Sequence, residues 1–246
     1  MNPFQLTIAL KSPLLVGLHA PRLDGVMWHV LFSHLGCQQK AADALSDYFD
    51  MAGEQGREYC KASSMRFGLL NPAPGATIVE SLLALETAKV GVMRPGRDLS
   101  PENFKPNGKR VNRYVNVNVR GRPYKNRMDD KRVYYASHLI FDGVGKGDEV
   151  ADLFRFYIPA IGVNANSGSG TIGTVYCSPE TTDRSLVDDA GLPTRPIPVD
   201  DFEALSNRKA YRTSDAILMP PFRKQPSVTC AVPERIRKTT IPQPGV

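Results

Sequence analysis

The residues best suited to chemistry with a polyanion lie in one stretch, residues 105–132, which we call the basic arm. It contains ten lysines and arginines against two aspartates, and so carries a net charge of +8. The whole chain of 246 residues carries +6, which leaves −2 for the remainder. Positive charge gathered in this way favours a polyanionic partner such as nucleic acid.

Three kinds of side chain in the basic arm are suited to RNA. Lysine and arginine supply the sequence-independent electrostatic part of affinity, and the planar guanidinium also grips phosphate through paired hydrogen bonds. Tyrosine rings can stack on unpaired bases. The alternative is a solvated charged loop, which the ratio of ten basic to two acidic residues disfavours. We predict RNA contacts from Lys109, Arg110, Arg113, Tyr114, Arg120, Arg122, Tyr124, Lys125 and Arg127.

A second candidate is the stretch IPAIGVNANSGSGTIGTV, residues 158–175, whose four glycines from Gly162 to Gly173 form what we call the glycine loop. Such a loop can present backbone N–H groups to phosphate, turn tightly against a strand, or flex. It is not a nucleotide-triphosphate loop, because it follows a predicted helix and leads into a strand, the reverse of a P-loop. The contacts that we predict here come from Asn164, Asn166, Ser167, Gly168 and Gly170.

Catalytic chemistry has weaker support. Histidine is the commonest general acid or base in metal-independent RNA cleavage, and His29 and His34 lie on one predicted helix. Local spacing does not place them with a further catalytic group, so we assign no catalytic residue and keep these two for the case that RNA is cut. The four cysteines are far apart, with no CxxC pair, which favours reduced thiols; we predict no metal and no cofactor.

The elements that must position these residues follow from hydrophobic periodicity. We expect a helix over residues 25–35, capped by Asp24 and stopped by Gly36, and a second helix over residues 40–51. A further helix begins at Gly147 or Asp148. The remaining apolar runs alternate as strands do and are bounded by turn residues. They predict strands over residues 4–10, 61–70, 77–88, 132–141 and 171–177, with a hairpin in the basic arm.

This order, strand–helix–strand twice over, predicts an α+β protein with a ferredoxin-like (RRM-like) fold. We place that domain at residues 1–177, with the basic hairpin inserted at about 94–131. Residues 178–246 are rich in proline and are expected to lie as an extended chain on the domain, without a core of their own. No segment has the roughly 18 apolar residues of a membrane span, and the start lacks a secretory signal pattern, so we expect a cytoplasmic protein.

Several motifs now stand in a recognisable order. RLDGVMWHVLF (residues 22–32) is followed by KASSMRFG (61–68), then by the basic insertion, and then by VYYASHLIFDGVGKGDEVADLFRFYIPAIG (133–162) with the glycine loop. The chain thereby resembles the RAMP proteins of CRISPR effector complexes, and within them the fifth Cas family in its type IV form. Residues 1–177 carry the resemblance, and family members often have basic residues in the loop where residues 162–167 have none.

The resemblance implies a non-catalytic subunit that caps the 5′ handle of the guide RNA (crRNA) and anchors the backbone filament. The basic hairpin would be the thumb that lies across the RNA. Implied partners are the guide RNA, the filament subunit and the large or small subunit, and contact with target DNA beside the protospacer stays open. Two alternatives remain, a metal-independent endoribonuclease that processes the guide, and a general basic RNA-binding protein.

Overall fold

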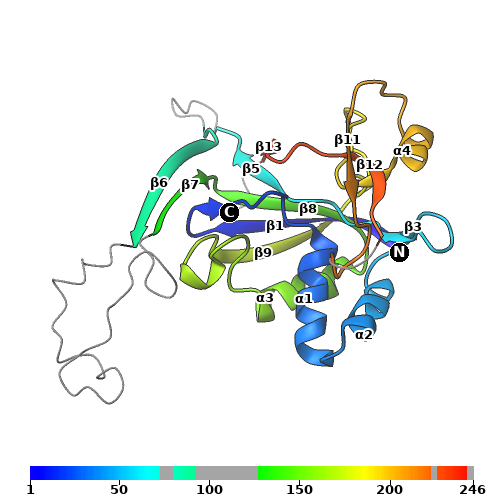
Figure 1. Ribbon diagram of the computed structural model, residues 1–246, viewed down its shortest axis with the longest axis horizontal. Coiled ribbons are helices and arrows are strands. Elements are labelled where there is room, and N and C mark those ends of the chain that lie inside the picture. Colours follow the sequence, from blue (N-terminus) through cyan, green and yellow to red (C-terminus); the bar gives the residue numbers. More distant parts are fainter. Residues whose placement is uncertain (73–79, 92–126, 223–225, 243–246) are drawn as a thin grey trace, which may run out of the picture. The chain divides into compact units, whose positions relative to one another are not determined.

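The computed structural model describes residues 1–72, 80–91, 127–222 and 226–242 (Figure 1). The predicted arm residues from Lys109 to Lys125 lie outside the described residues, as does most of the turn before the predicted strand at 77–88. Contacts divide the chain into two compact units, one of residues 1–84 and 134–246 and the other of residues 85–133.

The first unit is built on a five-stranded sheet, so the protein is α+β. Four of the strands are antiparallel neighbours in the order β5-β8-β1-β9, and a late strand, β13, adds to β5 in parallel. Helix α1 lies between β1 and β5 in the chain, and α3 between β8 and β9. The bounds are β1 (Asn2–Leu10), α1 (Leu23–Leu35), β5 (Arg66–Leu70), β8 (His138–Gly145), α3 (Gly147–Tyr157), β9 (Ile172–Pro179) and β13 (Lys238–Ile241).

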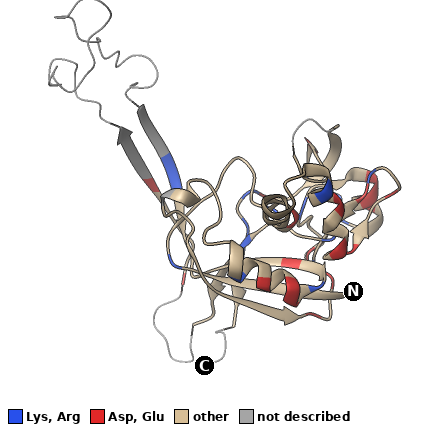
Figure 2. Ribbon diagram, turned by 90° about the horizontal axis from the view of Figure 1, so that it is seen from below, with Lys and Arg blue, Asp and Glu red and all other residues tan. Residues whose placement is uncertain are grey.

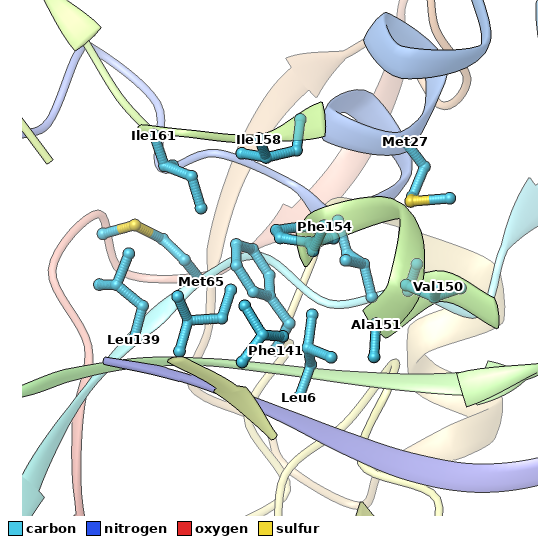
Figure 3. Packing of buried hydrophobic residues seen from close by; sticks show 14 of the residues in the cluster. Leu6, Met27, Met65, Leu139, Phe141, Val150, Ala151, Phe154, Ile158 and Ile161 are labelled. Carbon is cyan, nitrogen blue, oxygen red and sulfur yellow. The ribbon is translucent and has the colours of Figure 1, made fainter. Parts of the chain in front are cut away.

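The main core lies between the sheet and the two helices, which cover one of its faces (Figure 1). Alternate residues of β1 are buried, as a period of two requires. Figure 3 shows Leu6 and Phe141 from the sheet meeting Val150 and Phe154 from α3, all of them buried. Burial of such side chains contributes about 1.5–3 kcal/mol each. Neither of these helices covers the other face of the sheet, whose residues are considered with the site below.

The boundaries of α1 confirm one prediction and correct another. Gly36 ends the helix with a left-handed backbone (φ 64°), and its N–H donates to the carbonyl of Phe32, as expected for a terminal glycine. Asp24 is not the cap, because the helix begins at Leu23. Asp24 lies in the first turn, fully buried, where its carboxylate accepts hydrogen bonds from Arg22 and Arg195.

The second predicted helix, residues 40–51, is too long. Helix α2 (Gln38–Asp43) continues only into a 3₁₀ turn (Ala44–Asp47), and the chain then forms the small strand pair of β3 (Met51–Ala52) and β4 (Tyr59–Cys60). Backbone bonds to the end of β8 explain the early stop: Asp50 donates to Val144, and the carbonyl of Tyr48 accepts from Lys146. Tertiary pairing here replaces helical bonds.

The predicted strand over residues 132–141 is in fact two strands. β7 (Arg127–Tyr135) and β8 are interrupted at Ala136 and Ser137. Ser137 turns its N–H to the Glu80 carboxylate (2.7 Å), while its carbonyl accepts from Leu10 (2.8 Å). The second unit contains most of β7 and most of its sheet neighbour β6 (Leu83–Gly91). β6 overlaps the strand expected over 77–88 from Leu83 onward, and residues 77–79 lie outside the described residues.

The C-terminal segment corrects the expectation of an extended chain without a core. It forms a second antiparallel sheet in the order β10-β12-β11 together with helix α4. Ile197, Phe202 and Cys230 are fully buried there, in a cluster that also takes Tyr59. Pro198 is tolerated because β10 is an edge strand. The bounds are β10 (Ile197–Pro198), α4 (Val199–Leu205), β11 (Arg212–Ala216) and β12 (Val228–Val232).

Candidate nucleic-acid interface

The glycine loop is tied by its backbone to the segment that follows β1. Gly170 donates its N–H to the carbonyl of Pro13 (2.8 Å) and accepts from the N–H of Ile161 (2.9 Å). Val163 donates to Leu15 (2.9 Å), which belongs to the short strand β2 (Leu14–Leu15). The loop is therefore held at several points between α3 and β9.

Two serine side chains hold the same contact. Ser12 donates its hydroxyl to the carbonyl of Gly168 (2.7 Å) and accepts from the N–H of Thr171 (2.8 Å). Ser169 accepts from the N–H of Leu15 at 3.1 Å. These hydroxyls satisfy backbone groups that a loop would otherwise leave to water.

Gly170 shows why this loop needs glycine. Its φ is +64°, and a Cβ placed on it would lie 2.0 Å from the carbonyl oxygen of Ile161. A side chain would add a direct clash to the cost of left-handed backbone. The loop could bind phosphate through its backbone, form a tight turn, or be a flexible connection. Its geometry favours a tight turn against the neighbouring chain.

The predicted contact residues of the loop divide accordingly. Gly170 is buried, its N–H donates to Pro13 and its C=O accepts from Ile161, so its part is to shape the turn. Asn166 and Gly168 are exposed, and Asn164 is half-exposed with φ 61°. Ser167 ends a short 3₁₀ turn, Ala165–Ser167. The exposed members carry amide and backbone groups only, and no charge.

The base of the basic arm belongs to the second unit. Arg127 begins β7, and Arg132 on the same strand pairs with Glu86 of β6 at 2.9 Å. Both side chains of that pair are exposed, so the pair contributes little to stability. Figure 2 shows basic (blue) and acidic (red) residues on the described part of these two strands.

His29 and His34 are not brought together. Both are exposed on α1, and five positions along a helix place side chains about 140° apart around its axis. His34 instead meets the ring of Tyr157, edge to face, with centroids 4.4 Å apart. The two histidines therefore do not form an acid–base pair.

A cleft of about 1200 Å³ lies at the face of the sheet that α1 and α3 leave uncovered, and sequence reasoning missed it. Gln5 and Arg66 of the sheet line it together with chain from three later segments, residues 180–193, 208–212 and 232–242. Six of the lining residues are basic and four are acidic. The basic ones are Arg66, Arg184, Arg208, Arg212, Arg237 and Lys238, and the acidic ones are Glu180, Asp188, Asp189 and Glu234.

One arginine of the cleft is paired with a buried carboxylate, and a second lies in the electrostatic field of the same group. Arg66 forms a two-pronged ion pair with Asp142 of the adjacent strand, and Gln5 also donates to that carboxylate (3.2 Å). Arg237 binds the carbonyls of Ser64 and Thr194. Burial, and next the positive charge of Arg66, lower the pKa of Arg237 to about 10. Two guanidiniums thus adjoin one carboxylate at this wall.

A signal for this wall does exist in the sequence. Arg66 and Asp142 interrupt two strongly apolar strands, MRFGLL and HLIFDGV, and charges inside such runs must face either solvent or each other. Their pairing could not be read from the sequence, because they lie 76 positions apart. The cations of the C-terminal segment gave no comparable signal.

The thiols and the acidic residues give no sign of redox or metal chemistry in the described part of the chain. All four cysteines are free, and burial raises the pKa of the Cys60 thiol to about 12. Within residues that the structure describes, no group of three or more His, Cys, Asp or Glu side chains is placed to hold a metal ion. Nor does that part of the chain contain a helix of the length and apolarity needed to cross a membrane.

Comparison with models of known protein families and with the curated proteins finds no match to this chain.

Proposed function

We propose that this chain is a non-catalytic RNA-binding subunit of a type IV CRISPR effector complex, which caps the 5′ handle of the guide RNA and anchors the backbone filament. The observation that carries the proposal is the sheet order β5-β8-β1-β9 with α1 and α3 between its strands. Strand–helix–strand repeated twice is the ferredoxin-like order, which RRM-type RNA-binding modules share. The resemblance to RAMP proteins supports the proposal, and residues 22–32, 61–68 and 133–162, on which it rests, include parts of α1, β5, β8 and α3.

The glycine loop supports the proposal by its position and its surface. It joins α3 to β9 and is braced by β2, so that Asn164, Asn166 and Gly168 are presented from a held turn. Amide and backbone groups there can hydrogen-bond RNA without charge. Affinity in this proposal therefore comes mainly from the basic arm, whose net charge is +8. Hydrogen bonds from the loop fix the position of the RNA on the protein.

The test is binding of repeat-derived RNA in the presence of a chelator, read on a native and on a denaturing gel. We expect a shifted band and intact RNA. Changing Arg113, Arg120, Arg122 and Arg127 to glutamate should abolish retention of the RNA. The matched control reverses four exposed cations elsewhere, Lys40, Arg57, Lys146 and Lys209, with the same change in net charge.

Three outcomes would contradict the proposal, each in a different way. Unchanged affinity in the arm variant would remove the arm from the RNA site. Cleavage at one position would favour the endoribonuclease, and His29→Ala and His34→Ala would then be tested first. Equal affinity for repeat-derived and unrelated RNA, with no stable partner subunit, would favour a general RNA-binding protein.

A further inference from the structure

The cleft on the uncovered face of the sheet is lined by residues that belong to neither the glycine loop nor the basic arm, and its charges are not balanced. Three of its four acidic residues are already engaged. Arg184 holds both Asp189 (2.8 Å) and Glu180 (3.2 Å), and Asp188 accepts backbone N–H groups from Ala190 and Leu192 (3.0 and 2.9 Å). Only Glu234, among the acidic lining residues, has no such bond within the described part of the chain.

The cations on the rim are less engaged. Arg212 on β11 and Lys238 on β13 are exposed, and neither is in an ion pair with any residue that the structure describes. Arg208 is also exposed and donates to a neutral group, the carbonyl of Ala190 (3.0 Å). Three cations thus stand at the rim without a carboxylate from the described chain bound to them.

The wall behind this rim carries charges of both signs. Arg66 is paired with Asp142, and Arg237 lies in the field of Arg66 and of three carboxylates, those of Asp142, Asp188 and Glu234. The side chains of Arg66 and Asp142 are 11% and 4% exposed, so water screens their charges weakly. A carboxylate or phosphate entering the cleft would meet the exposed cations of the rim, in a lining that has six basic residues against four acidic ones. The body outside the basic arm is negative overall, so this excess is local.

Size and shape indicate what kind of anion fits. A volume of about 1200 Å³ exceeds the roughly 300–1,000 Å³ of small-molecule pockets. The rim cations come from β11, β13 and the chain before β11, as in grooves that track a nucleic-acid backbone. Tyr211 contributes an aromatic ring to the lining.

We propose that this cleft binds a single-stranded polynucleotide through its phosphates, with Arg208, Arg212 and Lys238 as the phosphate-contacting side chains. The proposal goes beyond capping of the guide handle, since it needs neither the arm nor the loop. RNA and DNA share the phosphate chemistry, and the experiment separates them by probe.

The test measures fluorescence anisotropy of labelled ten-residue oligouridylate and oligothymidylate. The parent protein is the full chain with the four arm arginines already changed to glutamate, so that the remaining affinity reports other sites. Changing Arg212 and Lys238 to glutamate should weaken binding about tenfold or more. It should also reduce the slope of log affinity against log salt concentration by roughly 1.4, because the slope changes by about 0.7 for each phosphate that the protein no longer neutralises.

A matched control lies beside the cleft. Lys209 is exposed and adjacent in the chain to Arg208, but it does not line the cleft. Lys209→Glu should change the affinity by less than about twofold, because its charge acts through screened solvent. Thermal unfolding of each variant separates a defect in binding from a defect in folding.

A local readout makes the outcome independent of the variants. Acetylation of lysines in the wild-type protein, followed by mass spectrometry, should show Lys238 protected by the oligonucleotide and Lys209 unprotected. Equal reactivity of Lys238 with and without oligonucleotide would overturn the proposal. It would also be overturned if oligoglutamate bound to the cleft and displaced the oligonucleotide. Handle binding by the wild-type protein would survive either result, so failure here is distinct from failure of the proposed function.

Discussion

The molecule contains two places where two arginines adjoin one buried aspartate, and they serve different ends. In the first, Arg22 and Arg195 both hold Asp24, at 3.0 and 3.1 Å; we call this group the clip. In the second, Arg66 and Arg237 adjoin Asp142 at the wall of the cleft. The charges are the same and both groups are buried, but only the second borders an open cleft.

The clip is buried, with only Arg22 slightly exposed, at 9%. Arg195 and Asp24 are fully buried, and the two guanidiniums also donate to backbone carbonyls, Leu218 among them (2.7 and 2.8 Å). Burial lowers the pKa of Arg22 to about 10, and its guanidinium also stacks on Phe222 at 3.9 Å. The clip thereby joins the start of α1 to two distant parts of the C-terminal segment.

The cleft group, by contrast, lies behind exposed cations and open volume. A buried positive excess that is closed off is bonded by the protein itself, whereas one beside a cleft can be compensated by a ligand. The same arginine–aspartate chemistry can thus join parts of the chain when protein surrounds it, or favour an anionic ligand when it borders a cleft. The predictions below test that distinction, in order of expected effect.

Asp24→Asn should be the most damaging change. It leaves two buried guanidiniums without a counter-ion, and breaking a buried pair in this way costs about 3–5 kcal/mol of unfolding free energy. Chemical denaturation measures the loss. Asp47→Asn is the control, since Asp47 is exposed, and it should stay within about 0.5 kcal/mol of the wild type. Equal stability of the two variants would show that the clip is not a structural joint.

Asp142→Asn should cost less stability and should strengthen binding. The pair borders an open cleft, from which a counter-ion can replace the lost carboxylate, so the expected loss is about 1–3 kcal/mol by denaturation. The variant also removes one negative charge from the wall. Oligonucleotide affinity in the anisotropy assay should therefore rise, most of all at low salt. Asp47→Asn makes the same change in net charge away from the cleft and should leave oligonucleotide affinity nearly unchanged. Weaker binding by Asp142→Asn would contradict the distinction.

The smallest effect concerns pH, and it applies to the cleft side of the sheet alone. His138 is on that face, opposite Ala9 and Gly68, and burial lowers its pKa. The folded state thus resists a proton that the unfolded chain takes up as pH falls through about 6.5. Stability should fall between about pH 7 and 5, and His138→Gln should flatten this slope in denaturation series. An equal slope in both proteins would assign the pH dependence elsewhere.

Prediction from the sequence succeeded where local pattern decides structure. Alternation in residues 4–10 gives β1, and Gly36 stops α1, because side-chain period and left-handed backbone are properties of a few adjacent residues. Prediction failed where distant chain competes. Backbone bonds from the end of β8 shorten the helix expected over 40–51, and Glu80 breaks the strand expected over 132–141.

The candidate sites divide in the same way. The basic arm and the glycine loop were found from composition, since their residues are adjacent in the chain. The cleft was not, because its cations come from Arg66 and from three segments more than one hundred positions later, and only the pairing of β13 with β5 brings Lys238 beside Phe67. Proline content suggested an extended C-terminal segment, yet its apolar residues close a second core around Tyr59.

The sequence by itself determined the order of the main strands and helices, the +8 arm and the end of α1 at Gly36, all of which depend on neighbouring residues. Only the tertiary structure decided that Asp24 would be a buried counter-ion and that scattered cations would line one cleft. Long-range strand pairing sets such contacts, and a register of pairing is chosen by the burial of whole faces rather than by any local run of residues.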